Sequence, residues 1–442
     1  ILNVLAKVDR LKVASRTSSF QFRNKDVGTP LIAKELGVRH VLEGSVRKAG
    51  DTVRITAQLI DTDTDAHLWS QTFDRPLTTK TIFAVQDEIA NSVLKELNVM
   101  LKGKAPAEPV SVAPPTEDKN AYELFLRAHQ LFINRGLGLR EAVLLLEQAV
   151  KIDPNFARAW AELAAAASVA LGWDVNDRDY RDLALRAADR ALALDPNQAR
   201  AYAAQGDVAD ELTFPPNFEL AREKLDRALS IDPRDVVALA WRGQIPLHTG
   251  DISQAIRLFQ KCLDADPGYL VCQFLLARAE LSQGNKTRAL EDFASVIRRG
   301  FSGAEPSFLR TLLEKGDTVG ASAIAFAVAH DPIVADALIV ALSEKSQETR
   351  SQALMRLGAR VTTGVVLKGY LMLQTATMQP ISDYKLIVQT SVDWIWIPDY
   401  AEYRKTADFK KLVTALGLPA YWRKHGWGDF CKPLGQTDFE CH

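Results

Sequence analysis

The sequence predicts an α/β amino-terminal domain followed by an all-α superhelical solenoid of repeated helix pairs. Three observations predict this order: alternating hydrophobicity within residues 40–73, a proline-rich segment over 104–117, and a dipeptide that recurs beyond it at similar spacing. At 442 residues the chain exceeds one compact core, since single cores stop growing near about 250–300 residues. Its 47% hydrophobic and 25% charged residues exclude a mostly disordered or collagen-like chain.

The α/β domain is predicted over residues 1–103. Pro30 and Gly37 bracket a short helix, because proline favours the first turn and glycine follows the last. Three runs of alternating apolar and polar residues then predict an antiparallel meander. These runs are 40–47, 53–60 and 67–73. Apolar residues at helical spacing over 82–97 predict a closing helix.

Composition changes after this domain. Residues 104–117 are rich in proline and small or polar residues, which predicts a linker. Strand patterns are absent beyond it. We predict helical repeats over 118–334, and a helical cap with a Cys-containing tail over 335–442.

The repeats are marked by an Asp-Pro dipeptide. Its prolines, Pro154, Pro196, Pro233 and Pro267, lie 42, 37 and 34 residues apart, and periods of this size indicate a solenoid. Alanine stands twelve positions before each proline, a leucine, alanine or phenylalanine stands eight positions before it, and alanine or cysteine stands five positions before it. The sets are Ala142, Leu146 and Ala149; Ala184, Ala188 and Ala191; Ala221, Leu225 and Ala228; and Ala255, Phe259 and Cys262. This pattern resembles the second helix of the tetratricopeptide repeat.

A second resemblance covers the first domain. The runs VASRTSSF over 13–20, AKELGVRHVLEGSVR over 33–47 and VRITAQLI over 53–60 resemble the TolB-amino-terminal-like domain of proteobacterial signalling proteins. The resemblance implies a relative with a class III nucleotide cyclase or a winged-helix domain ahead of a membrane helix. This chain lacks both domains and starts on Ile1, inside the α/β domain, so we expect it to be part of something longer.

No residue pattern predicts catalysis, a cofactor or a metal. The chain has no Gly-rich phosphate loop, Gly-x-Ser-x-Gly elbow or His-Glu-x-x-His motif. Asp61, Asp63 and Asp65 begin like a calcium loop, but Ala66 stands where the turn needs glycine and Thr72 where glutamate belongs. A solvated turn is the favoured interpretation. The seven histidines show no metal-ligand spacing apart from the adjacent Cys441 and His442.

Charge and hydropathy limit the partners. With 54 basic and 55 acidic residues, the net charge of −1 gives no field that would attract nucleic acid. No apolar run reaches the about 18 residues of a membrane span, so we expect membrane contact only through a missing amino-terminal helix. The carboxy-terminal aromatic residues could stack bases or sugars, but core packing is favoured. They are Trp394, Trp396, Tyr400, Tyr403, Tyr421, Trp422 and Trp427.

The groove that the repeat resemblance implies is the candidate binding site. First helices line a concave face in that family, and five residues are predicted on it: Arg158, Arg200, Asp207, Trp241 and Gln244. Paired guanidinium groups beside a tryptophan suit a peptide carboxylate or an acidic loop. The alternative is that these are ordinary solvated side chains on helices.

The four cysteines form two pairs with equal separation. A disulfide between Cys431 and Cys441 is favoured, because the tail between them has little apolar material to fold around. For Cys262 and Cys272, a second disulfide and a pair of buried thiols are equally open. Disulfides would indicate the periplasm, and free thiols the cytoplasm.

Together these features predict a non-catalytic, periplasmic sensor or interaction module that binds a protein or peptide in the repeats. In this hypothesis the α/β domain relays a signal or forms a homo-oligomer. The alternative is a structural scaffold subunit of a larger envelope complex. An enzyme is the least favoured of the three hypotheses.

Overall fold

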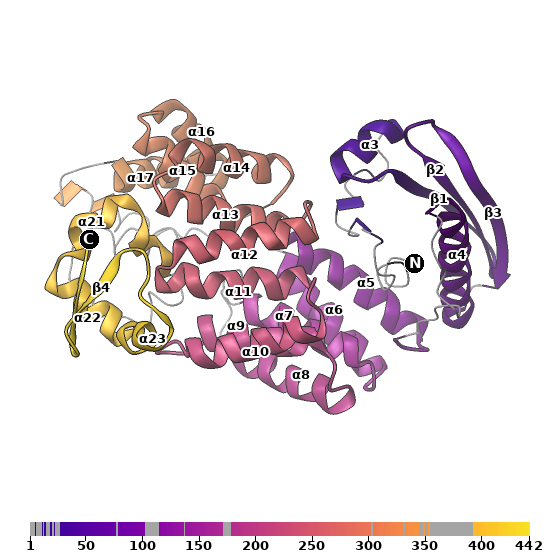
Figure 1. Ribbon diagram of the computed structural model, residues 1–442, viewed down its shortest axis with the longest axis horizontal. Helices are drawn as coiled ribbons and strands as arrows, with labels where there is room; N and C mark the ends of the chain where they lie inside the picture. Colours follow the sequence, from indigo (N-terminus) through magenta and orange to yellow (C-terminus); the bar gives the residue numbers. More distant parts are fainter. Residues whose placement is uncertain are drawn as a thin grey trace. The chain divides into compact units, whose positions relative to one another are not determined.

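The computed structural model describes residues 27–76, 78–101, 115–136, 138–170, 178–301, 304–329, 332–343 and 392–442, with a few isolated positions elsewhere (Figure 1). The chain divides into two compact units. One contains residues 1–123, 151–156 and 264–269, and the other contains the rest. Most of the predicted linker, residues 104–114, lies outside the described residues. So does nearly all of 344–391 within the predicted cap.

The first unit contains the predicted meander. Its elements are α3 (Thr29–Leu36), β1 (His40–Ala49), β2 (Thr52–Asp61), β3 (Ala66–Pro76) and α4 (Thr79–Leu101). The sheet is antiparallel in the order β1-β2-β3. Gly37 ends α3 with a φ of 61°, a left-handed conformation that glycine adopts without strain. The short helix, the three strands and the closing helix are confirmed.

Alternation along the strands gives the sheet one apolar and one polar face. Ala57, Leu59 and Phe73 are buried in one cluster with Val85 and Ile89 of α4. Residues at the intervening positions face the other way. There Arg54 pairs with Asp74 on the neighbouring strand, with Nε and Oδ1 2.7 Å apart. One face therefore forms the core with α4, and the other is polar.

Among the described residues the repeats form six helix pairs followed by a single helix. The pairs are α5 (Lys119–Asn134) with α6 (Gly138–Ile152), α7 (Ala157–Ala170) with α8 (Tyr180–Leu194), α9 (Ala199–Glu211) with α10 (Phe218–Ile231), α11 (Val236–Thr249) with α12 (Ile252–Ala265), α13 (Leu270–Ser282) with α14 (Lys286–Arg298), and α15 (Glu305–Glu314) with α16 (Thr318–Ala329). The single helix is α17 (Pro332–Ser343). We call the first helix of each pair the inner helix and the second the outer helix. Successive inner helices α7, α9, α11 and α13 contact one another.

The spacing pattern of the outer helices is confirmed, because all twelve predicted positions are buried. The facing position on the inner helix α11 is a glycine. A Cβ atom at Gly243 of α11 would overlap the ring of Phe259 on α12, so the pair packs this closely only because the position has no side chain. Gly250 then turns the chain between the two helices with a φ of 84°.

The Asp-Pro dipeptides have a local structural role. In each turn the aspartate Oδ1 accepts a hydrogen bond from the backbone N–H two residues later, as Asp195 does from Asn197 and Asp232 from Arg234. The proline between them has no N–H to offer and fixes its own φ. The repeated dipeptide is therefore the turn that ends one outer helix and begins the next inner helix.

Residues 392–442 form a small lobe, which we call the C-terminal lobe. It contains the short 3-10 helices η1 (Val392–Trp396) and η2 (Pro398–Tyr400), the helices α21 (Ala401–Arg404), α22 (Ala407–Ala415) and α23 (Leu418–His425), and a hairpin of β4 (Cys431–Leu434) and β5 (Asp438–Cys441). Trp394, Trp396, Tyr400 and Trp422 are buried in it, and the other predicted aromatic residues are partly buried. The expected core packing of this aromatic cluster is confirmed.

Candidate interaction surface of the inner helices

Buried charges link successive inner helices. Glu162 of α7 lies between His129 of α5 and Arg200 of α9, with its oxygens 2.5 Å from His129 Nδ1 and 3.2 Å from Arg200 Nη1. Arg200 also reaches Asp235 at the start of α11, at 2.9 Å. Burial alone would raise the pKa of Glu162, but the charges of His129 and Arg200 outweigh it and hold the pKa at about 2. Glu162 is therefore ionised and fully engaged.

The two arginines predicted on one face have different surroundings. Arg158 is exposed, and its guanidinium lies 5.2 Å from the ring centre of Phe125 on α5. Arg200 is only 18% exposed, and its charge is balanced by Glu162 and Asp235. Within the described part of the chain no carboxylate lies within ion-pair distance of Arg158. Of the two, Arg158 is the guanidinium that an acidic partner could reach.

Asp207 and Gln244 are not on an open surface. Asp207 is 2% exposed, and its Oδ2 has no hydrogen-bond partner among the described residues. Burial, and then the charge of Glu211, raise the pKa of Asp207 well above its usual value. Gln244 donates to Glu211 from 2.5 Å. These side chains belong to a buried polar cluster between α9 and α11.

His248 completes this cluster at the end of α11. Its Nδ1 lies 3.1 Å from both oxygens of Asp210 on α9, and both side chains are buried. Burial would lower the pKa of His248, but the carboxylate of Asp210 outweighs that effect and raises the pKa to about 9. His248 is thus a buried imidazolium at neutral pH, paired across two repeats.

The expectation that Trp241 is an exposed binding residue is wrong. Trp241 is 3% exposed, and every residue from 237 to 250 is buried. The reason is packing on several sides, since α11 contacts α9, α10, α13 and η1 of the C-terminal lobe. A helix covered in this way cannot present a tryptophan to a partner.

The C-terminal lobe binds the backbone carbonyls at the end of α11. The indole N–H of Trp396 donates to the carbonyl of His248 at 3.1 Å, and that of Trp422 donates to Thr249 at 2.8 Å. The last carbonyls of a helix have no partner within the helix. Two tryptophans that lie 148 and 173 residues away along the chain therefore cap this helix.

The following turn is held in the same way. The N–H of Asp429 donates to the carbonyl of Gly250 at 2.8 Å, and its carboxylate accepts from the N–H of Ser253 at 2.9 Å. A Cβ atom at Gly428 would lie 2.7 Å from the Gly250 carbonyl carbon, so glycine is needed for this approach. The lobe is thus fixed to the α11–α12 turn through backbone atoms.

An ion pair fixes the lobe to α13. Asp393 of η1 pairs with Arg278, and the two side chains are 3% and 8% exposed. Sequence reasoning missed both residues, and also Asp210 and His248, because their partners lie far away along the chain. The available signal is a pair of charged residues, Arg278 and Glu280, within the mostly apolar helix α13.

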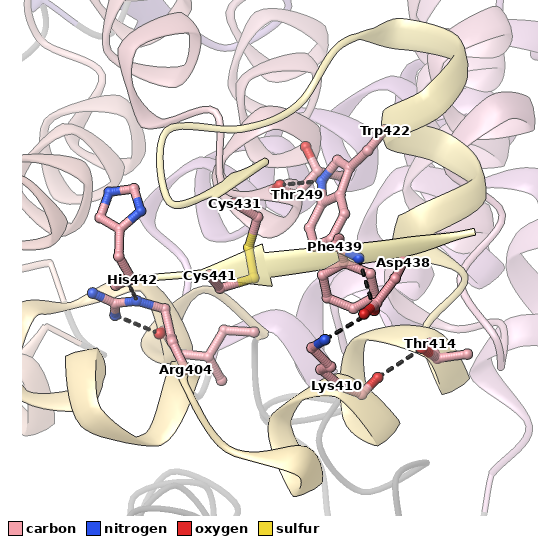
Figure 2. Close-up of a disulfide and its surroundings, with 11 residues drawn as sticks. Thr249, Arg404, Lys410, Thr414, Trp422, Cys431, Asp438, Phe439, Cys441 and His442 are labelled. Atoms are coloured by element: carbon pink, nitrogen blue, oxygen red, sulfur yellow. Dashed lines mark hydrogen bonds and ion pairs between the residues drawn. A yellow bond between two sulfur atoms is a disulfide. The ribbon is translucent and has the colours of Figure 1, made fainter. Parts of the chain in front are cut away.

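Both cysteine pairs are disulfides in the structure. Cys431 and Cys441 join β4 to β5 at directly opposed positions, with their Cα atoms 4.1 Å apart (Figure 2). Beside this bridge, Arg404 donates to the carbonyl of His442 at 2.6 Å and closes the end of the hairpin. Cys262 and Cys272 join α12 to α13, with their Cα atoms 6.3 Å apart.

Three further structural findings concern metal binding, the turn at Asp61 and the length of the apolar helices. Among the described residues no three His, Cys, Asp or Glu side chains are grouped so as to hold a metal ion. In the turn over 61–65, for which calcium binding is not favoured, Asp61 accepts hydrogen bonds from the N–H groups of Asp63 and Thr64 at 3.0 and 3.2 Å. Within the described ranges no helix is long and apolar enough to cross a bilayer.

Comparison with known proteins supports the repeats. Residues 247–299 match the tetratricopeptide repeat family. Over 205 residues the chain is 36% identical to a protein of Rhizobium meliloti (strain 1021) named "Putative adenylate cyclase 3". This match covers 46% of the chain and 34% of the relative, so it spans about a third of the relative's length.

Solved structures of repeat proteins resemble parts of the chain. A thermophilic TPR protein of Thermus thermophilus is 21% identical and covers 44% of this chain and 99% of its own, with a TM-score of 0.36. The human IFIT1 dimer with m7Gppp-AAAA is 13% identical and covers 76% of this chain and 78% of its own, with a TM-score of 0.46. The helix pairs and the family match identify the chain as mostly a tetratricopeptide-like solenoid, with a small three-stranded sheet near its start.

Proposed function

We propose that this chain is a non-catalytic interaction and sensor module of a bacterial signalling protein, and that it binds an acidic protein segment at Arg158. Tetratricopeptide repeats mediate protein–protein interaction. The observation that carries the proposal is the exposed guanidinium of Arg158, which is stacked on Phe125, makes no direct ion pair with a described carboxylate and acts on Glu162 only through its charge. Arg binds carboxylates in bidentate fashion, and an aromatic support orients it for that contact.

The signalling role is supported by the matched relative. Its name refers to adenylate cyclase, and this chain corresponds to about a third of it. In this proposal the nucleotide chemistry belongs to another part of such a protein, and the α/β unit at residues 1–103 is a TolB-amino-terminal-like relay. Sequence resemblance supports that assignment, together with the meander β1-β2-β3 and its covering helix α4.

The binding proposal is tested by reversing one charge. In Arg158→Glu, affinity for a panel of labelled acidic peptides should fall about tenfold or more, because a charge-assisted pair becomes a repulsion. Fluorescence anisotropy gives the affinities. The matched control is Arg181→Glu, which reverses an equally exposed charge on the outer helix α8. Peptide affinities that are the same in both variants would contradict the inner-helix surface as the binding site.

A periplasmic location is the second part of the proposal. Disulfides persist in oxidising compartments, and each pair here closes a sequence separation of 10 residues. Thiol blocking followed by mass spectrometry of unreduced protein from its native cells should recover both linked peptides. Free thiols at Cys431 and Cys441 would contradict the periplasm and favour a cytoplasmic protein.

A further inference from the structure

The C-terminal lobe presents a short acidic and aromatic segment to the inner helices. The guanidinium of Arg278, which pairs with Asp393, lies 5.3 Å from the ring centre of Trp394 and 5.5 Å from that of Phe274. Arg278 thus forms an ion pair with Asp393 and a cation–π contact with the neighbouring Trp394. Arginine flanked by aromatic rings is a frequent hot spot of protein interfaces.

Trp396 occupies the second position of this surface. Its ring is fully buried, its N–H donates to the carbonyl of His248, and it packs against Gly250. A Cβ atom at Gly250 would lie 3.0 Å from the Trp396 ring, so glycine leaves the space that the indole fills. The surface therefore offers space for an indole at Gly250, a carbonyl acceptor at His248 and a positive charge at Arg278.

We propose that Phe274, Arg278 and residues 248–250 form a recognition surface for protein segments in which an aspartate is followed by tryptophans one and three positions later. We call it the α11–α13 surface. The chain's own residues 393–396 occupy it in cis, and a partner protein carrying the same pattern would displace them. The inference goes beyond the proposed function, because it concerns other residues than Arg158 and stands on its own contacts.

The ion pair with Asp393 leaves one hydrogen-bond donor of Arg278 unused. Asp393 engages Nη2 of Arg278, whereas the buried Nε has no hydrogen-bond partner among the described residues. A carboxylate that approached the guanidinium side-on would satisfy both nitrogens. A buried donor without a partner is destabilising, so a partner segment with this geometry would gain a hydrogen bond that the cis segment lacks.

The test weakens the cis segment and supplies it in trans. A labelled peptide with the sequence of residues 391–400 is titrated into the full chain and into its Asp393→Asn variant. The variant should bind the peptide about tenfold more tightly, since the cis competitor at about millimolar effective concentration is weakened. The matched control, Asp408→Asn, removes an exposed charge from the same lobe and should behave like the unmodified chain.

Two further measurements decide the result. Peptide binding to Asp393→Asn should be lost when the peptide's aspartate at the position of Asp393 is replaced by asparagine, and should persist when the one at the position of Asp399 is replaced. Equal, weak binding by all three chains, with Asp393→Asn folded in a thermal melt, would overturn the proposal and leave a purely structural contact. If Asp393→Asn does not fold, hydrogen exchange of the unmodified chain decides: excess peptide should speed exchange in residues 418–434, and unchanged exchange there would overturn the proposal.

Discussion

The helices α11 and α12 are partners in one repeat, yet their surroundings differ. On α12, burial is confined to one stripe formed by Ile252, Ala255, Phe259 and Cys262. On α11, every residue from 237 to the end of the helix is buried. The outer helix is buried on one face only. The inner helix is buried on all sides, because other inner helices and the C-terminal lobe cover it. A partner can therefore reach the inner helices either where the lobe leaves them open or by displacing a segment of the lobe.

The largest expected effect is at the contact between inner helix and lobe. Arg278→Leu would leave Asp393 as a buried charge without its counter-ion, and removal of one partner of a buried pair costs about 3–5 kcal/mol. Denaturant unfolding, with the fluorescence of the lobe's tryptophans as the probe, measures the loss. Arg257→Leu on the exposed side of α12 is the control, with a change within about 0.5 kcal/mol. Similar losses in both variants would contradict the difference between the two helices.

This difference also explains what the sequence could predict. On the outer helices each small or large residue recurs at a fixed distance from the turn proline, because one face meets the same kind of neighbour in every repeat. The strands of the meander were predictable for the same reason, since alternation follows from one buried face. Trp241 was misplaced because a helix that is buried all round shows no periodicity. The repeat resemblance places Trp241 on the inner face of its helix, but it does not indicate that other helices and the C-terminal lobe cover that face.

The site was predicted less well than the fold. Arg158 is placed by its equivalence with Arg200, but nothing local in the sequence indicates that only Arg200 forms direct ion pairs with Glu162 and Asp235. The contacts of the C-terminal lobe could not be predicted either. They join backbone carbonyls near residue 249 to tryptophans at 396 and 422, and backbone acceptors leave no mark in a sequence.

The second prediction concerns pH and the buried pair on α11. The folded pKa of His248, about 9, lies above the ordinary value of 6.5. The pair with Asp210 therefore stabilises the fold fully below pH 6.5, and this contribution of about 3 kcal/mol is lost as the pH rises from 6.5 through 9. The raised pKa of Asp207 acts in the same direction, because the fold favours its neutral form and loses stability as the pH rises.

Unfolding in denaturant at a series of pH values between 6 and 9.5 measures this slope. In His248→Gln the slope should become shallower by the contribution of one proton, whereas replacing the exposed His67 by glutamine should leave it unchanged. A slope that persists in His248→Gln would assign the pH dependence to other groups. Such a result would contradict a stabilising buried ion pair between His248 and Asp210 on the inner helices.

The smallest effect is expected where the two helices meet. Gly243→Ala places a methyl group where the Phe259 ring lies, and overpacking of this kind typically costs about 1–3 kcal/mol. Alanine's better helix propensity returns up to about 1 kcal/mol, so a net loss of about 1–2 kcal/mol is expected in thermal or denaturant unfolding. Adding Phe259→Leu should recover part of the loss, because the smaller side chain makes room for the methyl group. If Gly243→Ala is neutral or stabilising, α11 and α12 are not in contact at this point, and the buried inner helix must be explained by its other neighbours.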